Sequence, residues 1–277
     1  MARTRWAPDS DPPYRLRKLH PLLFVSSHFY RETRRLMYSS PSIRLGIYSG
    51  VRLLQTLAMS PHLGEEVTSL YLDASVVRGT LTKANCEFAE ISSWIVRGLK
   101  NMPRLTSLRI EEYYGYLSPP YFFPSLIKGC CHFRLTSLKV NLRLTDPNEV
   151  PGLWEWIQTQ GDITSFTFTS RLQCLEIGFH VLPNLEYLDA PYEVAVNLLK
   201  TGPRPHLRAL TAARPENSPP VLPWTNAGSI QTLLLSGVYL PHIIGPKTIP
   251  FFHNLVELKI IIVPKTDLGW VRLSSLS

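Results

Sequence analysis

The most constraining feature of this sequence is a short phrase of apolar residues that recurs along the chain. The phrase is an apolar residue, two variable residues, an apolar residue, one variable residue and a third apolar residue, as in Val67, Leu70 and Leu72. Eight copies begin at residues 67, 105, 135, 163, 185, 207, 230 and 255. The first interval is 38 residues and the others lie between 22 and 30 residues. Such an ordered series indicates a structural repeat rather than chance clustering of leucine.

The last two apolar residues of each copy stand two positions apart, so their side chains point to the same face of a short strand. One such unit cannot bury its apolar face alone, and neighbouring units must therefore stack. Leucine-rich repeats have periods of about 20 to 29 residues, which most of these intervals match. The sequence therefore predicts an α/β fold. It is a leucine-rich-repeat solenoid with a parallel sheet on its concave face and helices or irregular segments outside.

The segments between the strands carry helical patterns. Ile91, Ile95 and Leu99 recur every four residues, as on one face of a helix, which we expect over residues 85–99. Further helices are expected over residues 51–59, within 146–161, and over 192–200. These segments would return the chain along the outer side of the sheet.

The variable positions of each strand face away from the core and line the concave face. Six of them are candidate partner-binding residues: Tyr71, Asp73, Arg109, Glu111, Lys139 and Asn141. They carry both charge signs and hydrogen-bonding groups, which suit a peptide or protein partner. Tyrosine and arginine are the residue types most often found as interface anchors, so Tyr71 and Arg109 are the strongest candidates.

The net charge of +8 belongs mostly to one end of the chain. Residues 1–44 hold nine Lys/Arg and three Asp/Glu, giving +6, and the rest of the chain carries +2. A nucleic-acid-binding domain carries its basic charge on the folded face, so we expect no nucleic-acid partner. The chain has neither an apolar run of about 18 residues nor a secretory signal pattern, so we expect no membrane span and a cytoplasmic or nuclear protein.

No enzyme motif is found in the sequence, so we expect a protein that is not an enzyme and has no cofactor, metal or small-molecule ligand. The tightest Cys/His cluster is Cys130-Cys131-His132, which lacks a second ligand pair at metal-like spacing. We interpret Cys86, Cys174 and this pair as reduced thiols. An aromatic segment over residues 113–123 is either a plug over the repeat core or an exposed binding patch.

A second pattern lies before the repeats. Apolar residues three or four apart over Leu19–Tyr38 indicate an amphipathic helix, which could simply cap the solenoid. The run Val25-Ser26-Ser27-His28-Phe29-Tyr30, followed by Arg34-Arg35-Leu36-Met37-Tyr38, resembles the second half of an F-box. Together with the repeats, the chain is similar to fungal F-box/leucine-rich-repeat proteins.

The resemblance implies a function. Proteins of this family are substrate-recognition subunits of SCF-type ubiquitin ligases, in which the F-box binds a Skp-type adaptor and, through it, a cullin. It implies five adaptor-facing or F-box-core residues, which are Leu19, Leu22, Val25, Phe29 and Tyr30. Alternatively, these side chains pack against the first repeat.

The F-box pattern is incomplete. The Leu-Pro-x-Glu helix that opens an F-box has no counterpart in Arg3–Lys18, so we expect an N-terminally truncated F-box. We predict three parts: a disordered basic tail over residues 1–15, a partial F-box-like helical segment over 16–45, and an irregular leucine-rich-repeat solenoid over 46–277. The alternative function is a repeat scaffold that binds protein without ligase coupling.

Overall fold

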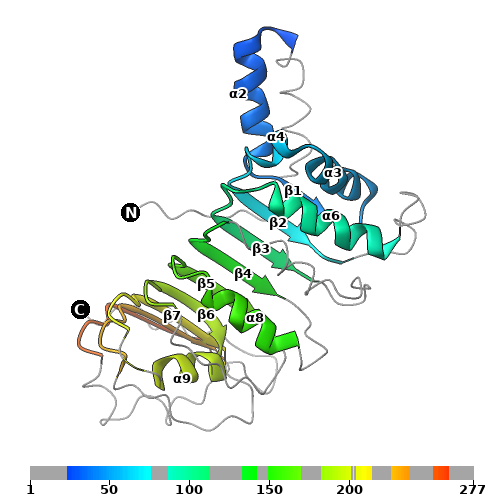
Figure 1. The fold of residues 1–277 in the computed structure, drawn as a ribbon. Coiled ribbons are helices and arrows are strands. Elements are labelled where there is room, and N and C mark those ends of the chain that lie inside the picture. Colours follow the sequence, from blue (N-terminus) through cyan, green and yellow to red (C-terminus); the bar gives the residue numbers. More distant parts are fainter. Residues whose placement is uncertain are drawn as a thin grey trace.

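The strands of the described residues form one parallel sheet (Figure 1). The computed structural model describes residues 24–75, 87–112, 133–141, 149–169, 182–200, 202, 204–213, 226–236 and 252–261. Within these residues, nine strands pair in sequence order. They are β1 (Ser42–Arg44), β2 (Ser69–Asp73), β3 (Ser107–Glu111), β4 (Ser137–Asn141), β5 (Ser165–Thr169), β6 (Tyr187–Pro191), β7 (Ala209–Ala213), β8 (Thr232–Ser236) and β9 (Glu257–Ile261).

The pairing register confirms the predicted solenoid. Leu70 of β2 pairs with Leu108 of β3, which pairs with Leu138 of β4, so equivalent positions of successive phrases lie side by side. The eight predicted strands are all present. β1 was not predicted from the sequence, and its Ile43 pairs with Leu72 of β2. The sheet therefore begins at Ser42. The predicted start of the solenoid was residue 46.

The described residues also form helices, four of which cover one side of the sheet. The helices are α2 (Ser27–Tyr38), α3 (Tyr48–Met59), α4 (Pro61–Gly64), α6 (Phe88–Lys100), α8 (Glu149–Gln158) and α9 (Tyr192–Lys200). Figure 1 shows α3, α6, α8 and α9 along one side of the sheet, whereas α2 extends away from the β1 end. Because helices are wider than strands, their placement on one side curves the sheet and makes the opposite face concave. The helices expected over 51–59, 85–99, within 146–161 and over 192–200 are confirmed, with ends shifted by a few residues. The helix expected over Leu19–Tyr38 begins only at Ser27, because Ser26 has an extended backbone and caps it, and residues 19–23 lie outside the described residues.

Local sequence explains where α6 begins and which face it buries. Glu87 caps its first turn, and the Glu90 carboxylate accepts a hydrogen bond from the Glu87 backbone N–H at 2.9 Å. The predicted stripe of Ile91, Ile95 and Leu99 is fully buried against the core. The structure thus confirms the helical spacing inferred from the sequence.

The core lies between the sheet and the helices. The two apolar residues of each strand are buried from β2 to β8, and the residues between them are half-buried on the opposite face. In the middle of the solenoid, Trp154 of α8 makes edge-to-face contacts with Phe166 and Phe168 of β5. Phe166 and Phe168 take the place of the aliphatic pairs found in the other strands. The large Trp154 side chain packs against both rings and so covers the core of this repeat.

The repeated Thr-Ser pairs have a structural role. In the second copy, the Thr106 hydroxyl and backbone N–H both donate to the Thr68 carbonyl oxygen, at 3.1 and 2.9 Å. Thr136 donates to the Thr106 carbonyl and Thr164 to the Thr136 carbonyl in the same way. The ladder begins with Thr68, whose hydroxyl donates to the Ser39 carbonyl. These bonds join consecutive coils immediately before each strand.

A buried glutamine joins the middle coils. Gln160 follows α8 and is only 4% exposed, and its side-chain oxygen accepts a hydrogen bond from the Leu135 backbone N–H at 3.1 Å. Its side-chain nitrogen donates to the Thr159 hydroxyl at 3.2 Å. The amide therefore satisfies a backbone donor that the sheet leaves without a strand partner, at a position 25 residues earlier in the sequence.

We predict that Gln160→Met lowers the free energy of unfolding by about 1–3 kcal/mol, because the buried Leu135 N–H loses its acceptor. Gln158→Met is the matched control, since Gln158 is exposed at the end of the same helix. Chemical denaturation followed by circular dichroism measures both variants. Equal stability of the two variants would contradict the role assigned to Gln160.

Candidate functional site

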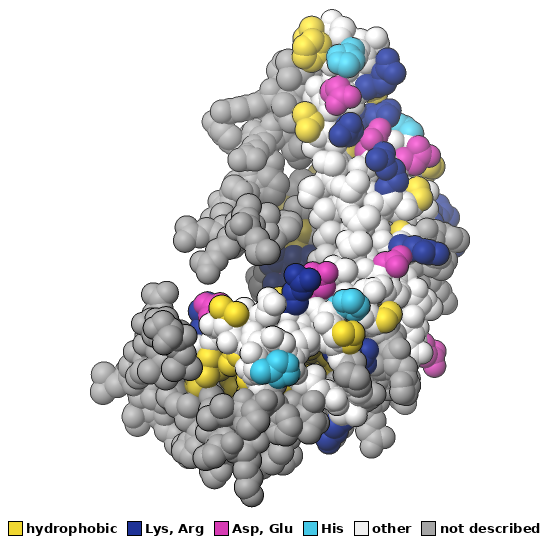
Figure 2. All heavy atoms as spheres, turned by 90° about the vertical axis from the view of Figure 1, so that its left-hand side faces the viewer, with side chains coloured by type: hydrophobic (Ala, Val, Ile, Leu, Met, Phe, Trp, Pro, Cys, Tyr) yellow, Lys and Arg dark blue, Asp and Glu magenta, His cyan; other side chains and the backbone are white. Residues whose placement is uncertain are grey.

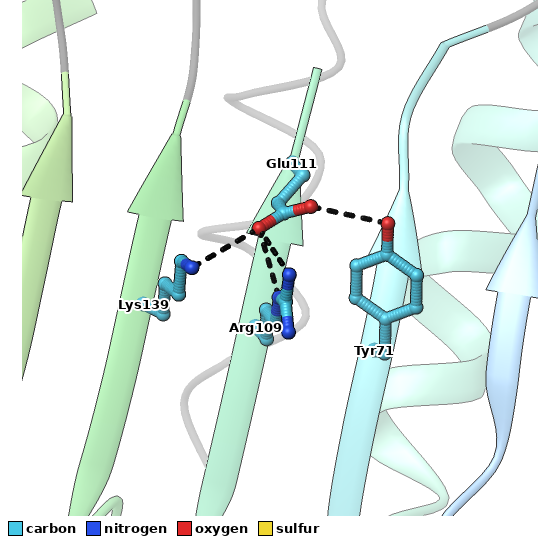
Figure 3. A network of polar contacts seen from close by, with 4 residues as sticks. All are labelled: Tyr71, Arg109, Glu111 and Lys139. Carbon is cyan, nitrogen blue, oxygen red and sulfur yellow. Dashed lines mark hydrogen bonds and ion pairs between the residues drawn. The ribbon is translucent and has the colours of Figure 1, made fainter. Parts of the chain in front are cut away.

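Four side chains from three neighbouring strands meet on the concave face (Figure 3). Tyr71 of β2, Arg109 and Glu111 of β3, and Lys139 of β4 form what we call the Glu111 cluster. Tyr71, Arg109 and Lys139 occupy one row across the sheet, because their positions pair in register. Glu111 lies two residues beyond Arg109 on the same face of β3, and its carboxylate turns back toward that row (Figure 3). Strand alternation and register together bring these four residues into contact.

The Glu111 carboxylate is the centre of the cluster. Its Oε1 accepts a hydrogen bond from Arg109 Nε at 2.8 Å and lies 3.3 Å from Lys139 Nζ. Its Oε2 accepts a hydrogen bond from the Tyr71 hydroxyl at 3.2 Å. The carboxylate is almost completely buried, with 5% of the side chain exposed. Burying a charge is costly unless it is paired, so these three donors are needed to keep the carboxylate there.

The cations of the cluster remain accessible. The side chains of Arg109 and Lys139 are 37% and 39% exposed. The Arg109 guanidinium lies 4.9 Å from the centre of the Tyr71 ring, which it also contacts as a cation–π pair. One carboxylate faces two cations, so the cluster carries a net positive charge. The buried Glu111 thus holds two basic groups and an aromatic ring in fixed positions on the concave surface.

Two of the six predicted concave residues stay outside this cluster. The Asp73 carboxylate accepts a hydrogen bond from the Ser75 backbone N–H at 3.0 Å, so it closes a turn after β2. Asn141 accepts a hydrogen bond from the Glu112 backbone N–H through its carbonyl oxygen at 2.8 Å. Both residues are half-buried on the same face as the cluster. They are placed as expected, and a role in binding remains a prediction.

Sequence analysis missed Asp189, which continues the same row on β6. Thr167 lies between Lys139 and Asp189 in the register. Burial raises the pKa of the Asp189 carboxyl, and the positive charge of Lys139 partly opposes this shift. Burial also raises the pKa of the neighbouring Tyr187 hydroxyl, as does the charge of Asp189. The strand alternation that selected Lys139 would have selected Asp189 as well.

The second candidate surface lies on α2, at the far end from β9. Ser26 caps this helix, and its side-chain oxygen accepts a hydrogen bond from the Phe29 N–H at 3.2 Å. Val25, immediately before the cap, is 61% exposed. Phe29 and Leu36 are also exposed, and their seven-residue separation places them on one face of the helix. We call Val25, Phe29 and Leu36 the α2 stripe.

The opposite face of α2 packs toward the solenoid. Arg34 lies on this face and forms an ion pair with Glu66 at 2.7 Å, just after α4. The buried Thr33 lies between the two faces, beside the α2 stripe, because it is four residues after Phe29 and three before Leu36. Tyr30 is turned toward this side, because its ring lies 5.9 Å from the Arg34 guanidinium carbon. Val25, Phe29 and Tyr30 are therefore all exposed, and Tyr30 also contacts the Arg34 guanidinium. Leu19 and Leu22 lie outside the described residues, and Leu36 is an exposed apolar residue that the sequence analysis did not select.

Other sequence candidates cannot be placed. Cys86, Cys130, Cys131, Cys174 and the aromatic segment 113–123 lie outside the described residues. Across the described ranges, no group of three or more His, Cys, Asp or Glu side chains could hold a metal ion. Figure 2 shows hydrophobic, basic and acidic side chains interspersed over the described part of one face, with a hollow between the two ends of the molecule.

Comparisons with known proteins do not name a family for this chain, so its structural class rests on the fold alone. No family model matches the chain, and no curated protein matches it either. The sheet of parallel strands in sequence order, with helices on one side, is the architecture of a leucine-rich-repeat solenoid. No helix of the described segments is long and apolar enough to cross a membrane.

We predict that Glu111→Gln lowers the free energy of unfolding by about 1–3 kcal/mol, because Arg109 and Lys139 lose their shared counter-charge. Glu186→Gln provides the control, since Glu186 is exposed just before β6 of the same sheet. Urea denaturation of both variants gives the difference. A loss no larger than that of Glu186→Gln would show that the cluster contributes nothing to stability.

The raised pKa of Asp189 predicts a pH effect of definite sign. An acid whose pKa is higher in the folded state binds more protons when folded, so this group makes the protein less stable as pH rises through that raised pKa. We therefore expect Asp189→Asn to be more stable than the wild type at pH 7. The difference should shrink as the pH falls toward the unfolded pKa of about 3.9. Urea denaturation at several pH values measures it, and a variant less stable at pH 7 would contradict the sign.

Proposed function

We propose that this protein is a protein-interaction module that recognises a substrate for an SCF-type ubiquitin ligase. In this proposal α2 binds a Skp-type adaptor, which connects the chain to a cullin, and the concave face binds the protein to be ubiquitinated. The observation that carries the proposal is the α2 stripe. It is an apolar helix face at the end of the solenoid, in the segment whose sequence resembles an F-box.

The position of α2 supports adaptor binding. An amphipathic helix that only capped the solenoid would turn its apolar side chains toward the first repeat. Instead, Val25, Phe29 and Leu36 are exposed to solvent, and α2 packs through Thr33, the polar Arg34 and, at its C-terminal end, Tyr38. An exposed apolar stripe on a helix fits an apolar groove between partner helices. Because α2 extends away from the sheet (Figure 1), a partner can reach its exposed side without contacting the concave face.

The concave face supplies the second half of the proposed function. Its half-exposed residues differ from strand to strand, with the positively charged Glu111 cluster over β2–β4 and Asp189 on β6. A surface of this kind binds by hydrogen bonds and paired charges around an anchor such as Tyr71. The polarity favours a protein partner over an apolar ligand.

Direct binding to a purified Skp-type adaptor tests the proposal. We expect the full chain to bind the adaptor in isothermal titration calorimetry. Val25→Asp should weaken this binding about tenfold or more, since it places a charge in an apolar contact worth over about 1.4 kcal/mol. The matched control is Val256→Asp, because Val256 is an equally apolar side chain, 79% exposed, just before β9 at the other end of the solenoid.

The two outcomes separate the candidate functions. Binding that is lost in Val25→Asp and kept in Val256→Asp supports the ligase role. A folded wild-type chain that does not bind the adaptor refutes the ligase role and leaves the alternative, a repeat scaffold that binds protein without ligase coupling. Circular dichroism shows that each variant keeps its fold before binding is compared.

A further inference from the structure

We infer that Arg34 and Glu66 are the positioning pair that fixes the α2 helix at one angle to the solenoid. This inference deepens the proposed function, because it concerns how the adaptor-binding helix is held relative to the concave face. The pair joins α2 to the segment after α4, and the two charged atoms lie 2.7 Å apart. The side chains of Arg34 and Glu66 are only 23% and 16% exposed. A short ion pair that is largely shielded from water is stronger than a surface pair.

The surroundings of Arg34 make Glu66 necessary. The positive charge of Arg34 is favoured by the Glu66 carboxylate, which raises the pKa of the guanidinium further. Within the described part of the chain its buried Nε atom has no hydrogen-bond partner, and the bond to Glu66 is made by a terminal nitrogen. The Tyr30 ring provides a second contact from one turn earlier on α2. Without Glu66, a mostly buried cation would remain at this junction, and α2 would turn to expose it.

A second contact fixes the other end of the same helix. The Ser39 carbonyl, directly after α2, accepts hydrogen bonds from the backbone N–H groups of Thr68 and Ser69 and from the Thr68 hydroxyl. Ser39, the C-cap residue of α2, is therefore part of the hydrogen-bonded ladder that leads into β2. This contact anchors the C-terminal end of α2, and the Arg34–Glu66 pair, five residues earlier, sets the direction of the helix from that anchor.

The apolar contacts of α2 are too few to set this direction by themselves. Thr33 is its one fully buried residue, and Tyr38, at its anchored C-terminal end, is the one apolar residue of α2 that packs against the core. Phe29 and Leu36, on the α2 stripe, are exposed. Among the described residues, the helix therefore has little apolar surface against the solenoid before Tyr38, and burial of apolar area is the main force that orients most surface helices. The orientation of α2 rests on the polar contacts of Arg34 and Ser39.

Distance measurements by electron spin resonance test the positioning role. Spin labels are attached through unnatural amino acids at Arg31 on α2 and Arg97 on α6, both exposed, so that all four cysteines are kept. We expect a narrow distance distribution in the otherwise wild-type chain. Glu66→Arg should broaden or shift the distribution, because it places two cations together. The double variant Arg34→Glu/Glu66→Arg should restore it by reversing the pair.

The control is Glu65→Arg, which makes the same charge change at the exposed neighbour of Glu66. This variant should leave the distribution unchanged. Hydrogen exchange of the α2 amides gives a second readout, which should be about tenfold faster in Glu66→Arg, as expected for losing about 1.4 kcal/mol of local stability. Unchanged distances and exchange in Glu66→Arg, or no recovery in the double variant, would overturn the inference.

Adaptor binding is measured separately on the same variants. If the wild-type chain does not bind a Skp-type adaptor, the proposed function fails, while the distances still decide whether Arg34 and Glu66 position α2. If the adaptor binds, we expect Glu66→Arg to keep the affinity of the wild type within about threefold, because the α2 stripe is on the opposite face. A variant that binds normally but with a broadened distance distribution would separate positioning from docking.

Discussion

The structure depends on the in-register burial of two apolar side chains per strand. Neighbouring strands stand about 4.8 Å apart, so each buried pair covers the next, and no coil has a complete core of its own. Leu70 and Leu72 of the second strand contribute to the same core as Leu108 and Ile110 of the third. The same register places every variable residue on the opposite face. The concave surface, with its Glu111 cluster, is therefore a consequence of how the core is packed.

The sequence predicted the fold well because the phrase encodes both spacing and orientation. The repeat of apolar positions gave the strands, the parallel order and the buried faces, and Ile91, Ile95 and Leu99 gave the face of α6. The first strand, Ser42–Arg44, was missed because it is three residues long and lacks the complete phrase. Its pairing depends on Ile43 meeting Leu72, a contact that is visible only when the chain is folded.

The candidate sites were predicted less completely. Alternation identified Tyr71, Arg109 and Lys139, but it could not show that Glu111 would be buried and shared by all three. That arrangement depends on side-chain directions across three strands. The F-box-like pattern identified Val25 and Phe29, which are exposed, whereas the packing of Arg34 against Glu66 joins residues 32 positions apart. Local patterns carry no information about such a contact.

The threonine ladder affects how the number of coils can change in evolution. Thr68, Thr106, Thr136 and Thr164 each stand at the same point of their coil, and each from Thr106 onward bonds to the carbonyl of the one before. If one whole coil between these threonines were deleted or duplicated, the coils brought together would again place a threonine hydroxyl next to a threonine carbonyl. Unequal recombination could therefore shorten or lengthen this half of the molecule without a mismatched junction. The span of the concave surface would then change in steps of one coil, while the helix at its start kept its anchor.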